Sequence, residues 1–123
     1  MKIILSTTNP SKVEQIRAMF KNPRVEIFTL QEAGILGEAI EDGETLEENA
    51  LKKARFAHNH LKNEDKTSWT MADDTGIFID TLNGEPGVKS ARWAGENVAR
   101  EEITEYCLKR MENVKDRSAT FKT

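Results

Sequence analysis

The sequence predicts an α/β fold in which helices flank a sheet. Two runs predict strands: an apolar run at residues 2–5 and a β-branched and apolar run at residues 67–72. Between them, residues 45–61 carry apolar side chains at helical spacing. Strands and helices thus alternate along the chain, which is the pattern of an α/β fold. The 123 residues contain no linker or repeat, so we expect one domain over residues 1–123.

The first helix is predicted by its cap. Asn9 is a good N-cap, and Pro10 fits the first position of a helix over residues 10–20 because its missing N–H costs nothing there. The other expected elements are a strand at 25–29, a capped single helical turn at 29–34, a turn at 83–84, a helix at 98–111 and a strand that starts within 116–123.

The second helix is the clearest element. Thr45 and Glu48 form a capping box at its start, and its apolar stripe is expected to pack on the sheet. Asn49 and Lys53 lie four residues apart on the flank of this stripe. We therefore expect both side chains to reach into a cleft.

Composition limits the partners of the protein. With 18 basic and 21 acidic residues the formal net charge is −3, which gives no basic surface for nucleic acid or an anionic membrane. A polyanionic ligand must then be held by local basic groups or by a metal. Cys107 is the only cysteine, so no internal disulfide forms and a reducing compartment fits. The apolar N-terminal run is too short for a signal peptide or a membrane span, and we expect a cytoplasmic protein.

The turn from the first strand into the first helix has the composition of a phosphate site. Thr7 and Thr8 bring two hydroxyls, Asn9 opens the helix, and Lys12 brings a positive charge. Backbone N–H groups at a helix N-terminus favour a phosphate chain. This is not a Walker A loop, because the glycines are absent. The alternative is a capped helix with a surface lysine.

Asp73 and Asp74 follow a predicted strand, and carboxyl ends of strands are where open α/β sheets place ligands. Mg²⁺ is usually held by one or two carboxylates together with substrate phosphates, and a carboxylate beside it can take a proton from attacking water. Because successive strand residues face apart, we expect one aspartate to bind the metal and the other to support it. The alternative is an ordinary turn.

Glu41 is a further acidic candidate. Carboxylates in the first turn of the second helix are explained by the helix dipole, which they complement, but Glu41 lies outside that turn.

Four other side chains are set aside. His58 and His60 face apart on a helix and are expected at the surface rather than as a ligand pair. Trp69 and Trp93 are expected in the core or in a cleft wall.

Taken together, these segments resemble the family of noncanonical purine nucleoside triphosphate pyrophosphatases, the inosine/xanthosine triphosphate pyrophosphatases or Ham1-like proteins. The resemblance covers the whole chain in order. The matching segments are residues 6–12 (STTNPSK), 41–50 (EDGETLEENA) with Lys53 and Ala54, 72–76 (ADDTG), 82–92 (LNGEPGVKSAR) and 117–121 (RSATF).

The resemblance implies a magnesium-dependent enzyme that cleaves inosine, xanthosine and deoxyinosine triphosphates between the α- and β-phosphates. It also implies a two-lobed fold around a mixed sheet, and a homodimer. By position, Glu41 and Asp74 would hold Mg²⁺, Asp74 would also accept the proton, and Lys53 and Thr75 would touch the nucleotide. The implied phosphate-binding residues are Thr7, Thr8, Asn9, Pro10, Ser11 and Lys12. We count Asp74, Lys12 and Asp73 as the catalytic candidates.

The chain resembles the N-terminal part of a family member. Members continue with a Gly-aromatic-Asp-Pro segment and a Ser-His-Arg segment that grip the purine, and neither is found in these 123 residues. We therefore keep an inert phosphate-binding remnant or assembly module as the alternative. The strand at 116–123, with Phe121 on its apolar face, also predicts self-association. The related Maf-type pyrophosphatases are a lesser alternative, which residues 41–54 and 86–92 disfavour.

Overall fold

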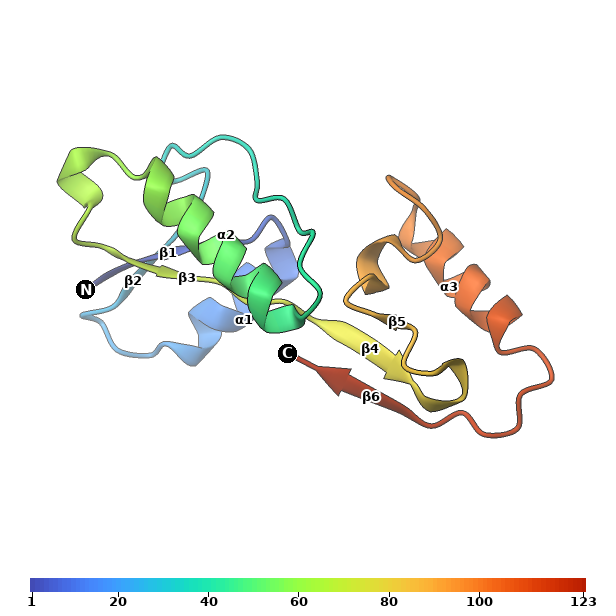
Figure 1. Ribbon diagram of the computed structural model, residues 1–123. Coiled ribbons are helices and arrows are strands. Elements are labelled where there is room, and N and C mark those ends of the chain that lie inside the picture. The colour runs from blue at the N-terminus through green and yellow to red at the C-terminus, as the bar shows by residue number, and fades with distance from the viewer. The chain divides into compact units, whose positions relative to one another are not determined.

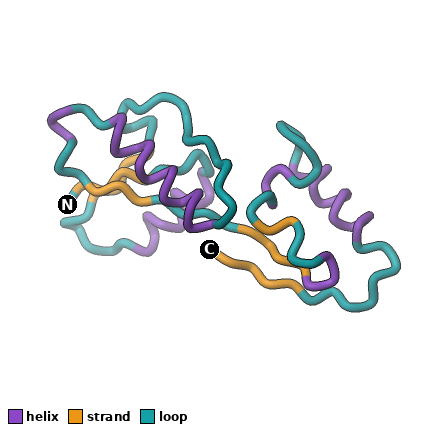
Figure 2. The backbone as a smooth tube through the Cα atoms, viewed as in Figure 1, coloured by secondary structure: helices purple, strands orange, loops and turns teal.

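The computed structural model describes residues 1–123 apart from the side chain of Glu64. The chain forms two compact units, residues 1–73 and residues 74–123. Helices and strands are found in both units (Figures 1 and 2), so the predicted α/β class is confirmed. Among the described residues, no helix combines the length and apolar character that a membrane crossing requires.

The first unit is built on a three-stranded parallel sheet. Its elements are β1 (Lys2–Leu5), α1 (Pro10–Met19), β2 (Glu26–Thr29), α2 (Leu46–His60), the 3₁₀ turn η1 (Asn63–Asp65) and β3 (Trp69–Met71). The strand order is β2-β1-β3, and α2 packs on β1 and β3 (Figure 1). Leu5 pairs with Thr29 on one side and Met71 on the other. The carboxyl ends of all three strands therefore meet at one edge of the sheet.

The core of this unit lies between the sheet and α2. Ile4 is fully buried at the centre of β1, and it packs in one cluster with four other buried apolar side chains. These are Leu30, Ile35, Ala57 and Leu61. Ala57 and Leu61 belong to the apolar stripe predicted for the second helix, so the expected packing of that stripe on the sheet is confirmed.

The helix starts follow the predicted caps. The Asn9 side chain accepts the N–H of Ser11, and the Thr45 side chain accepts the N–H of Glu48 at 3.1 Å. The capping box at 29–32 also forms, but it closes a turn and not a helix. There the Glu32 carboxylate accepts the Thr29 N–H at 2.7 Å, and this bond lowers the pKa of Glu32.

The second unit contains a three-stranded antiparallel sheet in the order β5-β4-β6. Its elements are β4 (Gly76–Ile79), the 3₁₀ turns η2 (Asp80–Leu82) and η3 (Ser90–Arg92), β5 (Pro86–Gly87), α3 (Arg100–Arg110) and β6 (Ala119–Lys122). The predicted turn at 83–84 joins β4 to β5, with positive φ at Asn83 and Gly84. The expected C-terminal strand forms as β6, where Phe121 is 72% exposed.

The burial of His58, His60 and Trp93 agrees with the predictions, whereas that of Trp69 does not. His58 and His60 are exposed, as expected. Trp93 is half-buried and packs edge-on against Tyr106. The prediction for Trp69 is wrong, because this side chain is 67% exposed. It begins β3, which is an edge strand with a single neighbour in its sheet.

Candidate functional site

The predicted phosphate-binding turn runs from the end of β1 into α1. Ser6 is buried, and its N–H donates to the Met71 carbonyl at 2.7 Å, which ties the turn to β3. The N–H of Asn9 donates to the Thr7 hydroxyl oxygen at 3.2 Å. With Asn9 as the cap and Pro10 at the first helical position, this turn leads into the N-terminus of a helix, and such ends favour anions.

Lys12 and Asp73 are brought together by the fold. Lys12 lies in the first turn of α1, and Asp73 follows β3. Lys12 Nζ lies 2.5 Å from Asp73 Oδ2, and both side chains are mostly buried, at 24% and 18% exposure. The charge of the lysine is thus held at the carboxyl edge of the parallel sheet, beside the helix N-terminus.

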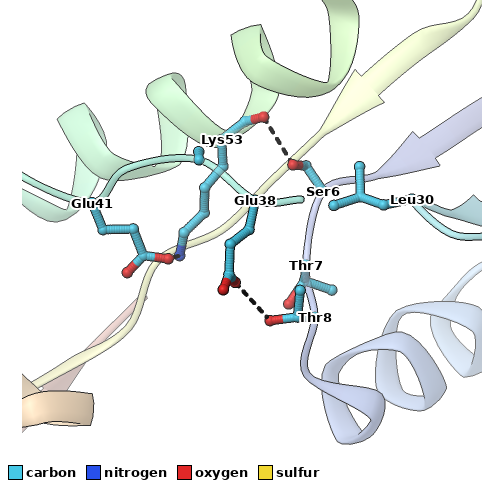
Figure 3. Close-up of a pocket in the computed structure, with 8 residues that line it drawn as sticks. Ser6, Thr7, Thr8, Leu30, Glu38, Glu41 and Lys53 are labelled. Atoms are coloured by element: carbon cyan, nitrogen blue, oxygen red, sulfur yellow. Dashed lines mark hydrogen bonds and ion pairs between the residues drawn. The ribbon is translucent and has the colours of Figure 1, made fainter. Parts of the chain in front are cut away.

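Lys53 connects the remaining groups. Its Nζ lies 2.8 Å from Glu41 Oε1 and donates to the Asp73 carbonyl at 3.2 Å. Its own carbonyl accepts the Ser6 hydroxyl at 2.8 Å, as Figure 3 shows. The Lys53 side chain is 13% exposed. The prediction that this lysine reaches a cleft is confirmed, because it lines the pocket described next, whereas the same prediction for Asn49 is wrong, since Asn49 is fully buried.

A small pocket of about 40 Å³ lies over these residues (Figure 3). Its lining residues are Ser6, Thr7, Thr8, Leu30, Glu38, Ala39, Glu41 and Lys53. A larger hollow of about 460 Å³ shares Thr7, Thr8 and Leu30 with it, so both openings expose the two threonines.

Glu38 is a pocket residue that the sequence reasoning missed. The Thr8 hydroxyl donates to Glu38 Oε2 at 3.4 Å (Figure 3). The signal for it was weak: an acidic residue three positions before Glu41 in an irregular, acidic segment. Its carboxylate and that of Glu41 face one pocket, which predicts a site for a cation as well as for phosphate.

Asp74 and Thr75 open the second unit. Asp74 is 9% exposed, and the Thr75 hydroxyl oxygen lies 3.0 Å from that of Thr123. The carboxylate of its neighbour, Asp73, is held by Lys12. The predicted sharing of one metal ion by Glu41 and Asp74 joins residues of the two units and stays a prediction.

The oxygen atoms that line the pocket suit a hard divalent cation as ligands. Carboxylate and hydroxyl oxygens of Glu38, Glu41 and Thr7 line it. Among the described side chains, no three acidic, histidine or cysteine groups gather as a metal cage. Mg²⁺ seldom uses such a cage, since it takes one or two carboxylates and completes its shell with phosphate and water. The chemistry of the donor set therefore fits the predicted ion.

Comparison with known proteins adds an independent line of evidence. The sequence model of the Ham1 family matches residues 3–123. The chain is 49% identical over 125 residues to a protein of a Thermoanaerobacter species named dITP/XTP pyrophosphatase, covering 100% of this chain and 61% of that protein. A Clostridium perfringens protein of the same name is 42% identical over 123 residues, covering 98% of this chain and 60% of that protein.

Solved structures agree with the sequence comparison. The Ham1 protein of Staphylococcus aureus superposes with a TM-score of 0.79 at 33% identity, and a HAM1 protein from Coxiella burnetii with 0.81 at 32% identity. Each match covers 98% of this chain and 59% of the solved chain. The chain thus spans about three-fifths of the length of the relatives that it matches.

Proposed function

Because this chain belongs to the Ham1 family, we propose that the protein hydrolyses noncanonical purine nucleoside triphosphates such as dITP, ITP and XTP to the monophosphate and pyrophosphate. Such an activity removes abnormal purines from the nucleotide pool. The observation that carries the proposal is the gathering of four charged groups at the carboxyl edge of the parallel sheet. These groups are Lys12, Asp73, Lys53 and Glu41.

The phosphate chain of the substrate is bound by the turn at residues 7–12. The helix N-terminus offers backbone N–H groups, and the Thr7 and Thr8 hydroxyls add donors at the pocket. Lys12 and Lys53 supply the positive charge that a protein with a formal net charge of −3 must provide locally. Pro10 and Ser11 complete the turn at the start of α1.

We propose that Glu41 and Asp74 hold the divalent ion, taken to be Mg²⁺. An ion held by these residues would polarise the phosphoryl oxygens and neutralise the charge that develops as the bond breaks. Asp74 accepts the proton of the attacking water, whose oxygen bonds to the α-phosphorus as the α–β bridging bond breaks and pyrophosphate leaves. Asp73 keeps Lys12 in place through their ion pair. Thr75 contacts the nucleotide.

The test is release of pyrophosphate from inosine, xanthosine, adenosine and guanosine triphosphates with Mg²⁺. We expect faster release from inosine and xanthosine triphosphates, and a loss of about 100-fold or more in Asp74→Asn, because removal of a general base costs 10²–10⁴-fold. Equal rates on all four substrates would contradict the proposed selectivity. An Asp74→Asn variant as fast as the parent would contradict the role of this carboxylate.

A phosphate-binding module without turnover is the second candidate. It is favoured by the position of the phosphate-binding groups, because Lys12 and Lys53 both belong to the first unit, residues 1–73, whereas Asp74 does not. Calorimetric titration with inosine triphosphate and Mg²⁺ separates the two candidates, since binding with no pyrophosphate release supports the module.

We also propose that the protein forms a homodimer. Light scattering in solution tests this, and a monomer at micromolar concentration would reject it.

A further inference from the structure

The acidic segment before α2, residues 41–44, contacts that helix through every one of its four residues. Four consecutive residues of the segment each bond to the first half of the helix, and the segment runs in the opposite direction to it. The bonds are Glu41 to Lys53 at 2.8 Å, Asp42 to Lys52 at 2.5 Å, the Gly43 N–H to Asn49 Oδ1 at 2.8 Å, and the Glu44 N–H to Glu48 Oε2 at 2.7 Å.

One of these bonds differs from the others in its burial. Asn49 is fully buried, and its side-chain oxygen accepts the backbone N–H of Gly43. By contrast, Asp42 is 71% exposed and Lys52 is 42% exposed. Exposed ion pairs contribute about 0–1 kcal/mol and hold their geometry loosely, whereas a buried amide that loses its partner pays the cost of desolvation. The bond to Asn49 therefore fixes the position of the segment.

The backbone at Gly43 lies directly against α2. A Cβ atom added there would stand 2.7 Å from Asn49 Oδ1 and 2.9 Å from Glu48 Cβ. Both distances are shorter than any ordinary contact of a Cβ atom, so a side chain at this position would push the segment away from the helix. The contact therefore needs both residues: Gly43 lets the backbone approach the helix, and Asn49 supplies the amide oxygen that accepts its N–H.

We propose that Asn49 is a positioning residue that sets the Glu41 carboxylate at the pocket by holding Gly43, two residues further along the chain. Asn49 and Lys53 are one helical turn apart, so one face of α2 holds both the backbone of the segment and the partner of its carboxylate. The proposal rests on the proposed function, in which Glu41 binds a divalent ion. It extends that function with a residue that touches neither ion nor substrate.

The test uses two variants that break this contact from opposite sides and one matched control. Asn49→Leu removes the acceptor at similar volume, Gly43→Ala keeps the acceptor but displaces the segment, and Lys52→Met removes the exposed ion pair. Mn²⁺ binding without nucleotide is measured by electron paramagnetic resonance. Pyrophosphate binding without metal is measured by calorimetry, and exchange of the Gly43 amide by hydrogen–deuterium exchange.

We expect both Asn49→Leu and Gly43→Ala to weaken Mn²⁺ binding by about 10- to 100-fold, the usual effect of losing a group that orients a metal ligand. Pyrophosphate binding should not weaken, because the turn at residues 7–12 is untouched, and the Gly43 amide should exchange faster in Asn49→Leu. Lys52→Met should bind both ligands as the parent does. If Asn49→Leu does not fold, Gly43→Ala decides alone, since its amide acceptor stays in place.

A loss of Mn²⁺ binding in Glu41→Gln but not in Asn49→Leu or Gly43→Ala would overturn the inference and leave the proposed metal role intact. A parallel loss of Mn²⁺ and pyrophosphate binding in Asn49→Leu would also overturn it, because that result indicates general damage to the fold. If the parent and Glu41→Gln bind Mn²⁺ equally, the metal role of Glu41 fails, and the inference fails with it.

Discussion

Replacement of Lys53 by methionine removes the group that connects both sides of the candidate site. The Lys53 Nζ makes two charge-assisted contacts, with Glu41 at 2.8 Å and with the Asp73 carbonyl at 3.2 Å. A hydrogen bond to a charged group contributes about 1.5–3 kcal/mol. Glu41 is 33% exposed, so water replaces part of what is lost. We therefore expect Lys53→Met to lower the free energy of unfolding by about 2 kcal/mol in all.

Urea denaturation followed by far-UV circular dichroism measures this change. With an m-value of about 2 kcal/mol/M, the midpoint should fall by about 1 M. The adjacent lysine supplies the control, since Lys52 lies on the same helix and its partner Asp42 is 71% exposed. Lys52→Met should shift the midpoint by less than about 0.3 M. Equal midpoints for the two variants would refute the reasoning, because burial of the contacts would then make no difference.

The same variant tests the binding role of Lys53. If this lysine takes part in phosphate binding, Lys53→Met should weaken pyrophosphate binding by about tenfold or more, or about 1.4 kcal/mol, in calorimetry without metal. Lys52→Met should bind pyrophosphate as the parent does. Unchanged affinity in Lys53→Met would leave the lysine with a structural role alone.

Three further predictions concern the stability of the fold. Gly76→Ala should destabilise the second unit by about 1–3 kcal/mol, the usual cost of overpacking, because the new Cβ would stand 2.5 Å from the Gly87 carbonyl; faster amide exchange in β4 checks it, and unchanged exchange contradicts it. Ile4→Ala should cost about 2–5 kcal/mol, because it leaves a cavity at a fully buried position, and a thermal midpoint equal to the parent's would exclude this. The pKa of Glu32 is lowered by the Thr29 N–H. The stabilisation that it brings is therefore present above the ordinary glutamate pKa of about 4.3 and is lost as the pH falls through the lower pKa of the folded state. Protection of the Thr29 amide, taken as its exchange rate relative to the intrinsic rate at each pH, should fall in acid in the parent but not in Glu32→Gln.

Local signals in the sequence were sufficient for most elements. The caps at Asn9 and Thr45 marked the starts of α1 and α2, because an N-cap acts on groups two or three residues away. The candidate phosphate turn was predicted from local signals too, since its polar groups lie within one short segment, and its binding role stays a prediction. The strands at the N-terminus, before Asp73 and at the C-terminus were also found, with ends within a few residues.

Burial of individual side chains was less predictable. Trp69 was expected inside and is exposed, because β3 forms an edge of its sheet, and strand order is not written in the strand's own residues. Asn49 was expected in a cleft and is buried under Gly43, a contact that depends on the path of the preceding segment. Both differences arise from neighbours that periodicity does not identify.

The sequence by itself determined which residue types are available for the chemistry: a helix N-terminus with hydroxyls, two lysines and a set of carboxylates. Only the tertiary structure decided their partners, with Lys12 held by Asp73 and Lys53 by Glu41. The tertiary structure also decided that Glu38 lines the pocket. The physical reason is that local hydrogen bonding sets each helix and turn, whereas the order of the strands and the packing of α2 decide which distant charges come within a few ångströms.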